Sequence, residues 1–370
     1  MIDKVANGSN NAERLSHQAG DRPMIVSISL RDFKAHKSLE LTNLPKVAVI
    51  VGPNNIGKST LLHAMAIPRY GLSQRPELPI GTSREIPRAG TSEARVKIQY
   101  AGNPSPPPLE IVVSSQSQFN QPNIILAPSG FHPFRRGPGE RPAEMGLFFN
   151  QPVPGLARYI VNDYVSFISA ARGLPGSFNY SPLDDEVGPI GENTGNILQN
   201  LISSRDGRFD AIEGWARQLG CDITSIASET IASNQGITTY TVRDVRTKST
   251  FVGSGTLSAI PIVVQGVLSH PGQTMLVEEP ESHLHRGAMN GLWKFFQDCA
   301  NRNVQVICTS HSFDFLEALY RRVMAQQVES EHVRIYALTR GQTGDTSVET
   351  ITPEQVSDYK DRIARKLADD

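Results

Sequence analysis

Apolar residues along this chain form short continuous runs separated by polar and glycine-rich segments. Three such runs are Val47–Val51, Thr274–Val277 and the apolar part of Asn303–His311. A strand that is buried on both faces of a sheet has this pattern, because neither of its faces contacts water. Each run ends in glycine or in polar residues. The pattern predicts buried strands with functional side chains at their carboxyl ends.

The N-terminal half carries other patterns. Apolar residues spaced between Met24 and Leu41 predict two strands joined by a polar turn around Lys34–Lys37. Residues 68–150 hold many of the 25 prolines. We expect an antiparallel β layer there, with a long irregular excursion at 115–150, because proline is confined to sheet edges and turns.

The rest of the chain alternates between helical and extended patterns. We expect a helix and then a short strand in 155–170, helical structure over 192–219, two strands with a turn at Asn234–Gly236, βα alternation from about 255 to 320, a hairpin over 333–351 and a last helix from Pro353. Residues 1–22 are polar and lack periodicity, which predicts a disordered tail.

A phosphate-binding motif follows the first buried run. The segment Gly52–Thr60 fits G-x-x-x-x-G-K-[ST], with a strand-like run before it and a helix-like stretch after it. Glycines in such a loop let backbone N–H groups surround phosphate oxygens, while the lysine reaches the β- and γ-phosphates and the serine hydroxyl binds Mg²⁺. The predicted nucleotide-binding residues are Gly52, Asn54, Asn55, Gly57, Lys58, Ser59 and Thr60.

Two acidic residues end the second buried run. In P-loop enzymes a carboxylate at this place lies on the Mg²⁺ side of the site, and the next acid can accept a proton from the attacking water. We therefore predict Ser59 and Glu278 as metal ligands and Glu279 as the general base. The first acid is more often Asp, and Glu278 lengthens the reach to the metal. The alternative is that the two acids only form a solvated strand end. The presence of a phosphate-loop motif in the same chain makes this alternative less favoured.

The order of these motifs resembles that of ABC-type ATPases of the SMC, RecF and OLD branch, and most of all the compact AAA-like group that includes OLD-family ATPase domains. The resemblance covers most of residues 24–340, including Asp32–Lys34, Phe167–Arg172, Val187–Asn193, Glu278–His285 and Thr309–His311. The string Glu-Glu-Pro-Glu-x-His-Leu-His is specific to this group. Arg286 stands where the group usually has proline, and the chain shows neither a TOPRIM-like nuclease domain after residue 340 nor long SMC-type arms.

The resemblance implies an α/β fold, a P-loop NTPase head of ABC type with a mixed β-sheet, an antiparallel β subdomain and a helical insertion. The domain division that we expect is a tail (1–22), an ATPase core (23–67 and 251–345), an insertion with the β layer, the irregular loop and the helical part (68–250), and a C-terminal strand and helix (346–370).

The resemblance also implies roles for residues that the motifs alone leave open. His311 corresponds to a histidine that contacts the γ-phosphate and the base, although an isolated histidine after a strand is usually packing or solvent-facing. Ser254 and Gly255 lie in a loop that resembles a degenerate ABC signature, which caps the nucleotide of the opposite subunit. Arg172 is expected at the nucleotide or the dimer face, and a surface ion pair explains it nearly as well.

Histidines at positions 283 and 285 suggest a second interpretation of the segment after the acidic pair. Two histidines at this spacing could bind a metal, but they point apart on a helix and no other ligands cluster with them in the sequence. We favour a loop that faces the partner subunit.

Composition limits the remaining choices. The net charge of −1 lacks the basic excess typical of nucleic-acid-binding proteins, so contact with DNA or RNA must be local or supplied by a partner. The three cysteines are far apart, which indicates reduced core residues. No apolar run is long enough to span a membrane. We expect a cytoplasmic protein that uses ATP and Mg²⁺ as cofactors and makes no membrane contact.

Three functions are compatible with this pattern. The favoured one is the ATPase subunit of a two-component bacterial anti-phage defence system, which dimerises around nucleotide and controls a separate nuclease or toxin, as stand-alone ATPases of this group often do. The alternatives are a RecF-like repair ATPase that clamps DNA and an ATP-dependent assembly scaffold with little hydrolysis.

Overall fold

The computed structural model describes residues 24–70, 85–101, 108–114, 165–181, 186–219, 223–232, 234–242, 244–248, 252–341 and 345–359. The predicted tail, the excursion at 115–150 and the predicted helix before residue 165 lie outside these residues.

A six-stranded sheet forms the centre of the described structure. Its order is β14 (Thr346–Ile351), β13 (Val333–Arg340), β3 (Val47–Val51), β12 (Gln305–Ser310), β11 (Thr274–Glu278) and β6 (Val165–Ile168). All neighbours are parallel except β14, which pairs antiparallel with β13. The three continuous apolar runs are three of its four inner strands, β3, β12 and β11, as the pattern predicts.

Side chains alternate across this sheet between two separate hydrophobic cores. In β3, Val47, Val49 and Val51 join one core, whereas Ala48 and Ile50 join the other. This alternation follows from the two-residue period of a strand. Since both faces are covered, no polar residue is needed before the strand ends, which explains the continuous apolar runs.

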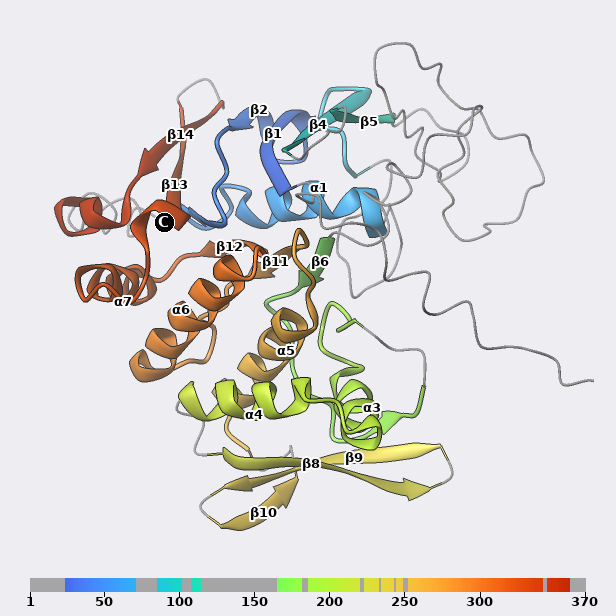
Figure 1. Cartoon of the computed structure of the whole chain (residues 1–370). Coiled ribbons are helices and arrows are strands. Elements are labelled where there is room, and N and C mark those ends of the chain that lie inside the picture. Colours follow the sequence, from blue (N-terminus) through green and yellow to red (C-terminus); the bar gives the residue numbers. More distant parts are fainter. Residues whose placement is uncertain are drawn as a thin grey trace, which may run out of the picture.

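The first face carries the phosphate-loop helix α1 (Lys58–Tyr70) and an antiparallel sheet. This sheet contains β2 (His36–Leu41), β1 (Met24–Phe33), β4 (Glu93–Ala101) and β5 (Leu109–Ser114), in that order. Figure 1 shows it above α1, with the central sheet beneath. In β4, exposed and buried residues alternate along the whole strand, because only one face of this sheet is packed.

The second face carries the remaining helices. They are α5 (Ser254–Leu268), α6 (Arg286–Asn301) and α7 (Phe313–Met324), followed outward by α3 (Thr194–Ser204) and α4 (Arg208–Gln218). Trp293 of α6 stacks on Phe315 of α7, with ring centroids 4.4 Å apart, and donates a hydrogen bond to the Phe315 carbonyl. Offset aromatic pairs of this kind stabilise helix packing beyond their buried area.

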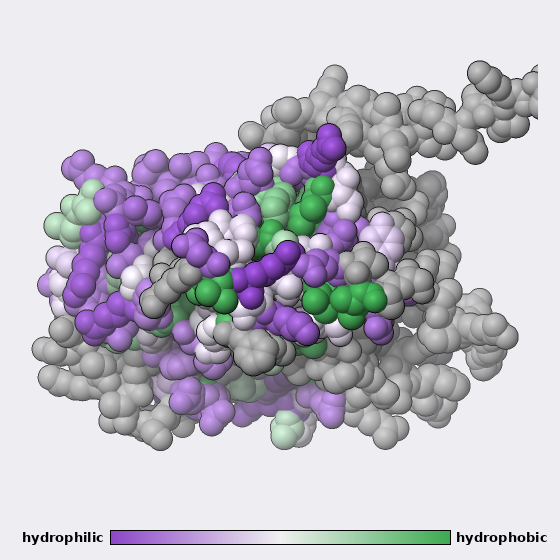
Figure 2. All heavy atoms as spheres, turned by 90° about the horizontal axis from the view of Figure 1, so that it is seen from below, coloured by the Kyte–Doolittle hydropathy of each residue, from purple (hydrophilic) through white to green (hydrophobic). Residues whose placement is uncertain are grey.

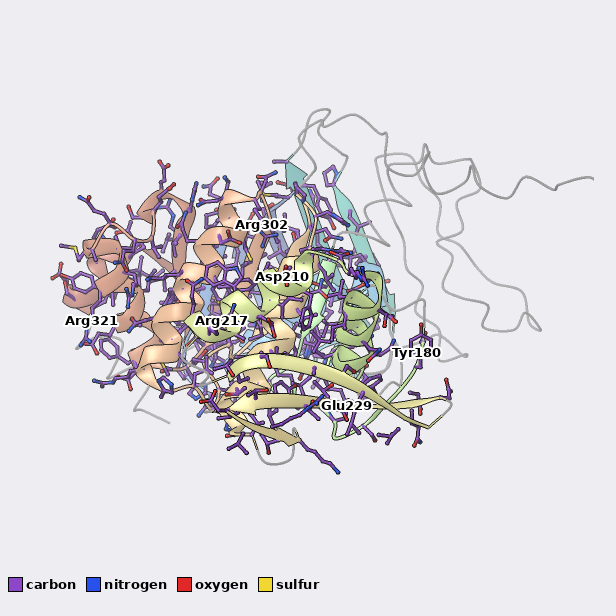
Figure 3. All side chains as sticks on the ribbon, turned by 60° about the horizontal axis from the view of Figure 1, so that its bottom comes forward. Tyr180, Asp210, Arg217, Glu229, Arg302 and Arg321 are labelled. Carbon is purple, nitrogen blue, oxygen red and sulfur yellow. The ribbon has the colours of Figure 1, made fainter. Side chains whose placement is uncertain are left out.

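A third, smaller sheet covers α3 and α4. It is built from β7 (Phe178–Asn179), β8 (Ile223–Ala232), β9 (Gln235–Val242) and β10 (Val245–Lys248). Figure 3 shows Asp210 and Arg217 on α4 beside this sheet, and Arg217 donates to the carbonyl of Thr224. From this end the surface is largely hydrophilic, with small hydrophobic areas separated by polar ones (Figure 2).

Several expectations are confirmed, and others change. The turn at Asn234–Gly236 joins β8 to β9, both helices of 192–219 form, and the hairpin of 333–351 is β13–β14. The last helix expected from Pro353 begins with a 3-10 turn, Pro353–Gln355, and residues 356–359 are α-helical. Strand β10 was not expected. Among the described residues, no helix is long and apolar enough to cross a membrane.

The expected domain division separates strands that the fold pairs. β6 comes from the segment assigned to the insertion, yet it is the edge strand of the central sheet. β1, assigned to the ATPase core, pairs with β4 of the insertion. The reason is that sequence segmentation detects local composition, whereas strand pairing joins segments of any separation.

Gln305 connects the antiparallel sheet to the central one. Its fully buried side chain accepts hydrogen bonds from the Ile25 N–H and the Thr274 hydroxyl, and donates to the carbonyls of Ile25 and Pro45. One amide therefore satisfies the backbone of β1 at the point where it meets β12. A buried backbone group without a partner is costly, so this residue has no apolar substitute.

We expect Gln305→Leu to lower the free energy of unfolding by about 2–4 kcal/mol, because it leaves the Ile25 backbone groups buried without partners. Chemical denaturation measures the change. Gln218→Leu, at the exposed end of α4, is the matched control. A loss at Gln305 no larger than that of the control would contradict this account of how the sheets are joined.

Candidate nucleotide-binding and catalytic site

The phosphate loop lies between β3 and α1, as its sequence context predicts. Gly57 has φ +102, and a Cβ there would lie 2.4 Å from the His36 Nε2. Asn55, at φ +59, also adopts a left-handed conformation. Lys58 is buried, and its Nζ donates to the carbonyls of Gly52 and Pro53, at 2.8 and 2.7 Å. The loop thus curls around its own lysine, which fits a phosphate cradle.

His36 supports this loop from the antiparallel sheet, a role that sequence reasoning missed. Its ring is fully buried, with Nε2 3.0 Å from the Gly57 carbonyl and Nδ1 2.9 Å from the Thr346 hydroxyl. A carbonyl only accepts, so Nε2 carries the proton and Nδ1 accepts from Thr346. Burial lowers the pKa of His36, which favours this neutral form. No local motif marks this histidine, because its partners are distant in sequence.

Glu278 ends β11 and faces the start of α1. Its carboxylate accepts hydrogen bonds from the Ser169 hydroxyl and the Ala170 N–H, and its Oε1 lies 3.3 Å from the His63 Nε2. The Ser59 hydroxyl of the phosphate loop also helps to lower the pKa of Glu278. Burial alone would raise the pKa of Glu278, but these contacts outweigh it and leave the pKa lowered. Glu278 is therefore ionised beside Ser59. A serine hydroxyl and a carboxylate are hard oxygen donors, which suit Mg²⁺.

Glu279 is held in the left-handed region, at φ +41, with its N–H bonded to the Thr309 carbonyl at 3.0 Å. This backbone turns its side chain away from that of Glu278. The carboxylate lies 3.2 Å from the His311 Nδ1 through one oxygen and accepts from the Ser282 hydroxyl through the other. The Glu279 side chain is 33% exposed. A partly exposed carboxylate with a histidine neighbour can hold a water and accept its proton.

The candidate signature residues lie elsewhere. Ser254 and Gly255 start α5, which packs in the core on the opposite face of the central sheet from α1. The N-cap Gly253 offers no side chain, so the first N–H groups of α5 receive no side-chain cap. A Cβ at Gly255 would lie 2.6 Å from the His283 carbonyl, so glycine is required there. The structure brings Lys58, Ser59, Glu278, Glu279 and His311 to one edge of the sheet, and places Ser254 and Gly255 on another surface.

Comparisons with known proteins agree with this geometry. A family model described as "AAA domain, putative AbiEii toxin, Type IV TA system" matches residues 143–317. The DNA replication and repair protein RecF of Lacticaseibacillus casei (strain BL23) is 22% identical over 213 residues, which are 53% of this chain and 56% of that protein. RecF of Roseiflexus castenholzii is 32% identical over 89 residues, 24% of this chain and 19% of that protein. The chain spans about half the length of the first of these relatives.

Two solved structures share the fold. An SMC head bound to the C-terminal winged-helix domain of ScpA has a TM-score of 0.50 at 13% identity, and covers 91% of this chain and 100% of its own. An SMC head of Pyrococcus furiosus with an extended coiled coil, bound to the C-terminal domain of ScpA, has a TM-score of 0.53 at 12% identity, with coverage of 92% and 100%. The chain has the α/β P-loop NTPase fold of these SMC heads and is similar in sequence to RecF and to the AAA family model.

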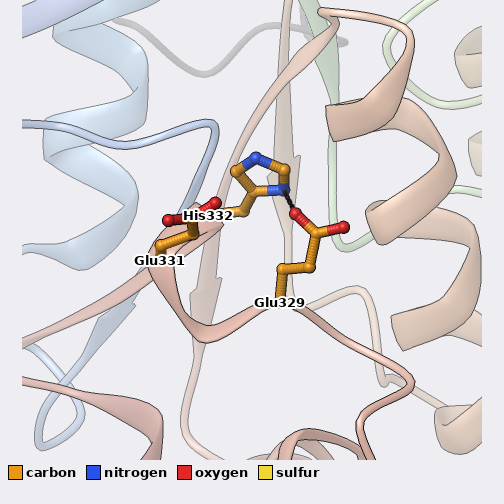
Figure 4. Close-up of side chains that lie close together, drawn as sticks. All are labelled: Glu329, Glu331 and His332. Atoms are coloured by element: carbon orange, nitrogen blue, oxygen red, sulfur yellow. Dashed lines mark ion pairs between the residues drawn. The ribbon is translucent and has the colours of Figure 1, made fainter.

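The segment after the acidic pair has a structural role. The His285 Nδ1 accepts from the Ala288 N–H and caps α6. His283 has φ +67 in the turn before it. Within the described ranges, one group of side chains could hold a metal ion, and it consists of Glu329, Glu331 and His332 (Figure 4). Neither His283 nor His285 belongs to it. Both glutamates of that group are exposed, and acidic side chains often gather so without a metal.

Arg172 does not form the surface ion pair that we considered. It is 6% exposed and its guanidinium donates to backbone carbonyls around the end of β11. Its place in the sequence, after a short strand, gave no sign of this burial.

Glu281 is the third acid of the same segment, and its environment differs from that of the other two. Its side chain is buried, with Oε1 2.5 Å from the Ser310 hydroxyl and Oε2 without a hydrogen-bond partner. Burial raises the pKa of Glu281, although Ser310 and His311 oppose the shift. Burial therefore makes Glu281 easier to protonate than a carboxyl group in water.

We expect Gly57→Ala to weaken ATP binding about tenfold or more, because it combines backbone strain with a clash against His36. Titration of a fluorescent ATP analogue measures the dissociation constant. Gly90→Ala is the matched control: Gly90 also has positive φ, at +89, but nothing lies within 4 Å of its Cβ position. Wild-type affinity in Gly57→Ala would show that the loop does not depend on this contact.

Glu281→Gln tests the raised pKa of Glu281. A raised folded-state pKa contributes stability that is present below the unfolded pKa and is lost as pH rises through the folded pKa. Glutamine imitates the neutral acid, so the variant should lose less stability than wild type between about pH 5 and pH 8. Urea denaturation at both pH values gives the difference. An equal pH dependence in the two proteins would mean that Glu281 is ionised in the folded state.

Proposed function

We propose that this chain binds ATP with Mg²⁺ and hydrolyses it through attack of water on the γ-phosphate. The supporting observation is the geometry at the end of β11. Glu278 lies 3.3 Å from His63 of α1 and has a pKa lowered in part by Ser59 of the phosphate loop, and Glu279 next to it lies 3.2 Å from His311. Two adjacent carboxylates therefore serve different purposes, because one is buried against α1 and the other faces solvent.

Each residue has a defined task in this proposal. The loop N–H groups and Lys58 bind the phosphates, and the lysine exchanges its two carbonyl partners for phosphate oxygens. Ser59 and Glu278 would hold Mg²⁺, which supplies charge neutralisation at the β- and γ-phosphates. Glu279 orients the water and takes its proton, while His311 donates toward the developing negative charge and holds the Glu279 carboxylate.

The site is incomplete within one chain. Ser254 and the uncapped N-terminus of α5 suit an anion, but they lie on the other face of the sheet from α1. We propose that two heads close on two nucleotides, so that Ser254 and Gly255 of each head meet the γ-phosphate held by the other. ATP binding then favours association, and hydrolysis favours separation.

For the biological role, we propose the ATPase and sensor subunit of a bacterial anti-phage defence system that controls a separate nuclease or toxin. Support comes from the matched family description, which names a toxin–antitoxin context. A RecF-like clamp on DNA is the second candidate, supported by the RecF relatives. The net charge of −1 argues against a broad DNA-binding surface.

Light scattering tests the nucleotide-driven association. We would measure the mass of wild type, Lys58→Ala and Glu279→Gln with and without ATP and Mg²⁺, together with phosphate release. Glu279→Gln should gain a higher-mass state with ATP and lose hydrolysis by about a hundredfold or more, because it binds nucleotide without a base. Lys58→Ala should show neither association nor turnover.

Two exposed substitutions serve as controls, Glu331→Gln for the carboxylate and Lys248→Ala for the lysine. If the measured mass is the same with and without ATP and Glu279→Gln hydrolyses ATP like wild type, the chain is an ATP-binding scaffold and the proposed ATPase mechanism fails. Fluorescence anisotropy with duplex DNA separates the second candidate, because a clamp requires ATP-dependent binding that weakens with salt.

A further inference from the structure

Arg172 makes an unusual set of contacts just beyond the end of β6. Its Nε donates to the carbonyl of Ser258, at 2.8 Å. One terminal nitrogen donates to the carbonyls of Ser169 and Glu278, at 3.1 and 2.7 Å, and the other to the carbonyl of Glu279, at 2.9 Å. All these acceptors are backbone oxygens, so a single side chain fixes the path of three chain segments.

None of the hydrogen bonds of the Arg172 guanidinium goes to a carboxylate, but carboxylates nearby balance its charge. Burial lowers the pKa of Arg172 to about 10, and the nearby carboxylates of Glu281, Glu279 and Glu278 oppose that shift. The side chain therefore stays charged at neutral pH. Its charge in turn offsets the repulsion of acids placed close together in sequence, which would otherwise disfavour the turn after β11.

The segments that Arg172 joins belong to two different functional surfaces. Glu278 and Glu279 belong to the hydrolytic site of this head. Ser258 lies in the first turns of α5, directly after Ser254 and Gly255. The Ser258 hydroxyl also donates to the Ser282 carbonyl, and Gly255 packs closely on His283, so the turn after Glu279 contacts the first turns of α5.

α5 depends on outside contacts at this point. Pro261 lies inside the helix and has no N–H, so the carbonyl of Leu257 loses its usual donor from one turn ahead. The neighbouring carbonyl of Ser258 receives the hydrogen bond from Arg172. The N-terminal part of α5 is thus held by the end of β6 as well as by its own ladder.

We propose that Arg172 is a positioning residue that fixes, through one guanidinium, both the catalytic turn of its own head and the signature loop that this head offers to its partner. This inference rests on the proposed nucleotide sandwich. A lysine carries the charge but cannot donate in three directions from a planar fork, so Arg172→Lys should loosen both surfaces at once.

A complementation assay separates the two effects. Head A carries Ser254→Arg, which blocks its signature loop but leaves its own nucleotide site intact. Head B carries Lys58→Ala, which removes its nucleotide site but leaves its signature loop intact. Neither head alone should hydrolyse ATP, and their mixture should restore phosphate release from one composite site. Arg172→Lys is then added either to head A, where it tests the catalytic turn, or to head B, where it tests the signature loop.

Phosphate release should fall about tenfold or more in both mixtures, because small displacements of catalytic groups are costly. Arg302→Lys is the matched control. Arg302, labelled in Figure 3, also donates to a carbonyl of α5, but to Gly266 near the other end of the helix. A decrease in only one mixture, or in neither, overturns the dual role.

Amide hydrogen exchange on the chain without nucleotide gives a readout that does not depend on dimers. In Arg172→Lys, exchange should accelerate in peptides covering both 254–260 and 279–284, whereas Arg302→Lys should change neither. Arg172→Gln is measured in parallel. Its side chain still donates a hydrogen bond but buries no charge, so the test remains available if Arg172→Lys fails to fold. Unchanged exchange in either peptide contradicts the proposal. An inactive parent mixture would instead contradict the nucleotide sandwich, and the exchange data would still decide the role of Arg172.

Discussion

Three carboxyl groups within four residues must be accommodated at the end of β11, and much of the surrounding structure serves that need. Placed together at the end of a buried strand, such groups repel one another. Each meets a different environment. Hydrogen bonds lower the pKa of Glu278, Glu279 reaches solvent beside His311, and burial raises the pKa of Glu281. Arg172 lies among their backbones and supplies the compensating charge. Differences in environment, rather than in residue type, give three glutamates three roles.

The central sheet separates the residues of the proposed nucleotide site within one chain. Because its two faces belong to separate cores, α1, which follows the phosphate loop, and α5, which begins at the proposed signature residues, are on opposite sides. A second head is therefore the natural source of the missing contacts in the proposed mechanism. The same separation gives Arg172 its importance, since it contacts the catalytic turn and α5 together.

Support for the phosphate loop comes from residues far away in sequence. His36 joins Gly57 to Thr346, so the loop is tied both to the antiparallel sheet and to the hairpin β13–β14. Gln305 joins the same sheet to β12 through the backbone of Ile25. These buried polar contacts specify one arrangement of the layers, because each of the groups involved would be costly without its partner.

The sequence by itself determined the buried strands, the phosphate loop and the acidic pair, because each of these is a local pattern of adjacent residues. The continuous runs within β3, β11 and β12 and the motif at Gly52–Thr60 could be recognised without knowing what lies next to them in space. Only the tertiary structure decided the roles of His36, His63 and Arg172, and the place of β6 in the central sheet. Their partners lie across long sequence separations, and burial and hydrogen-bond geometry exist only once the layers have packed. An arginine after a short strand looks the same in sequence whether it faces water or fixes three buried segments.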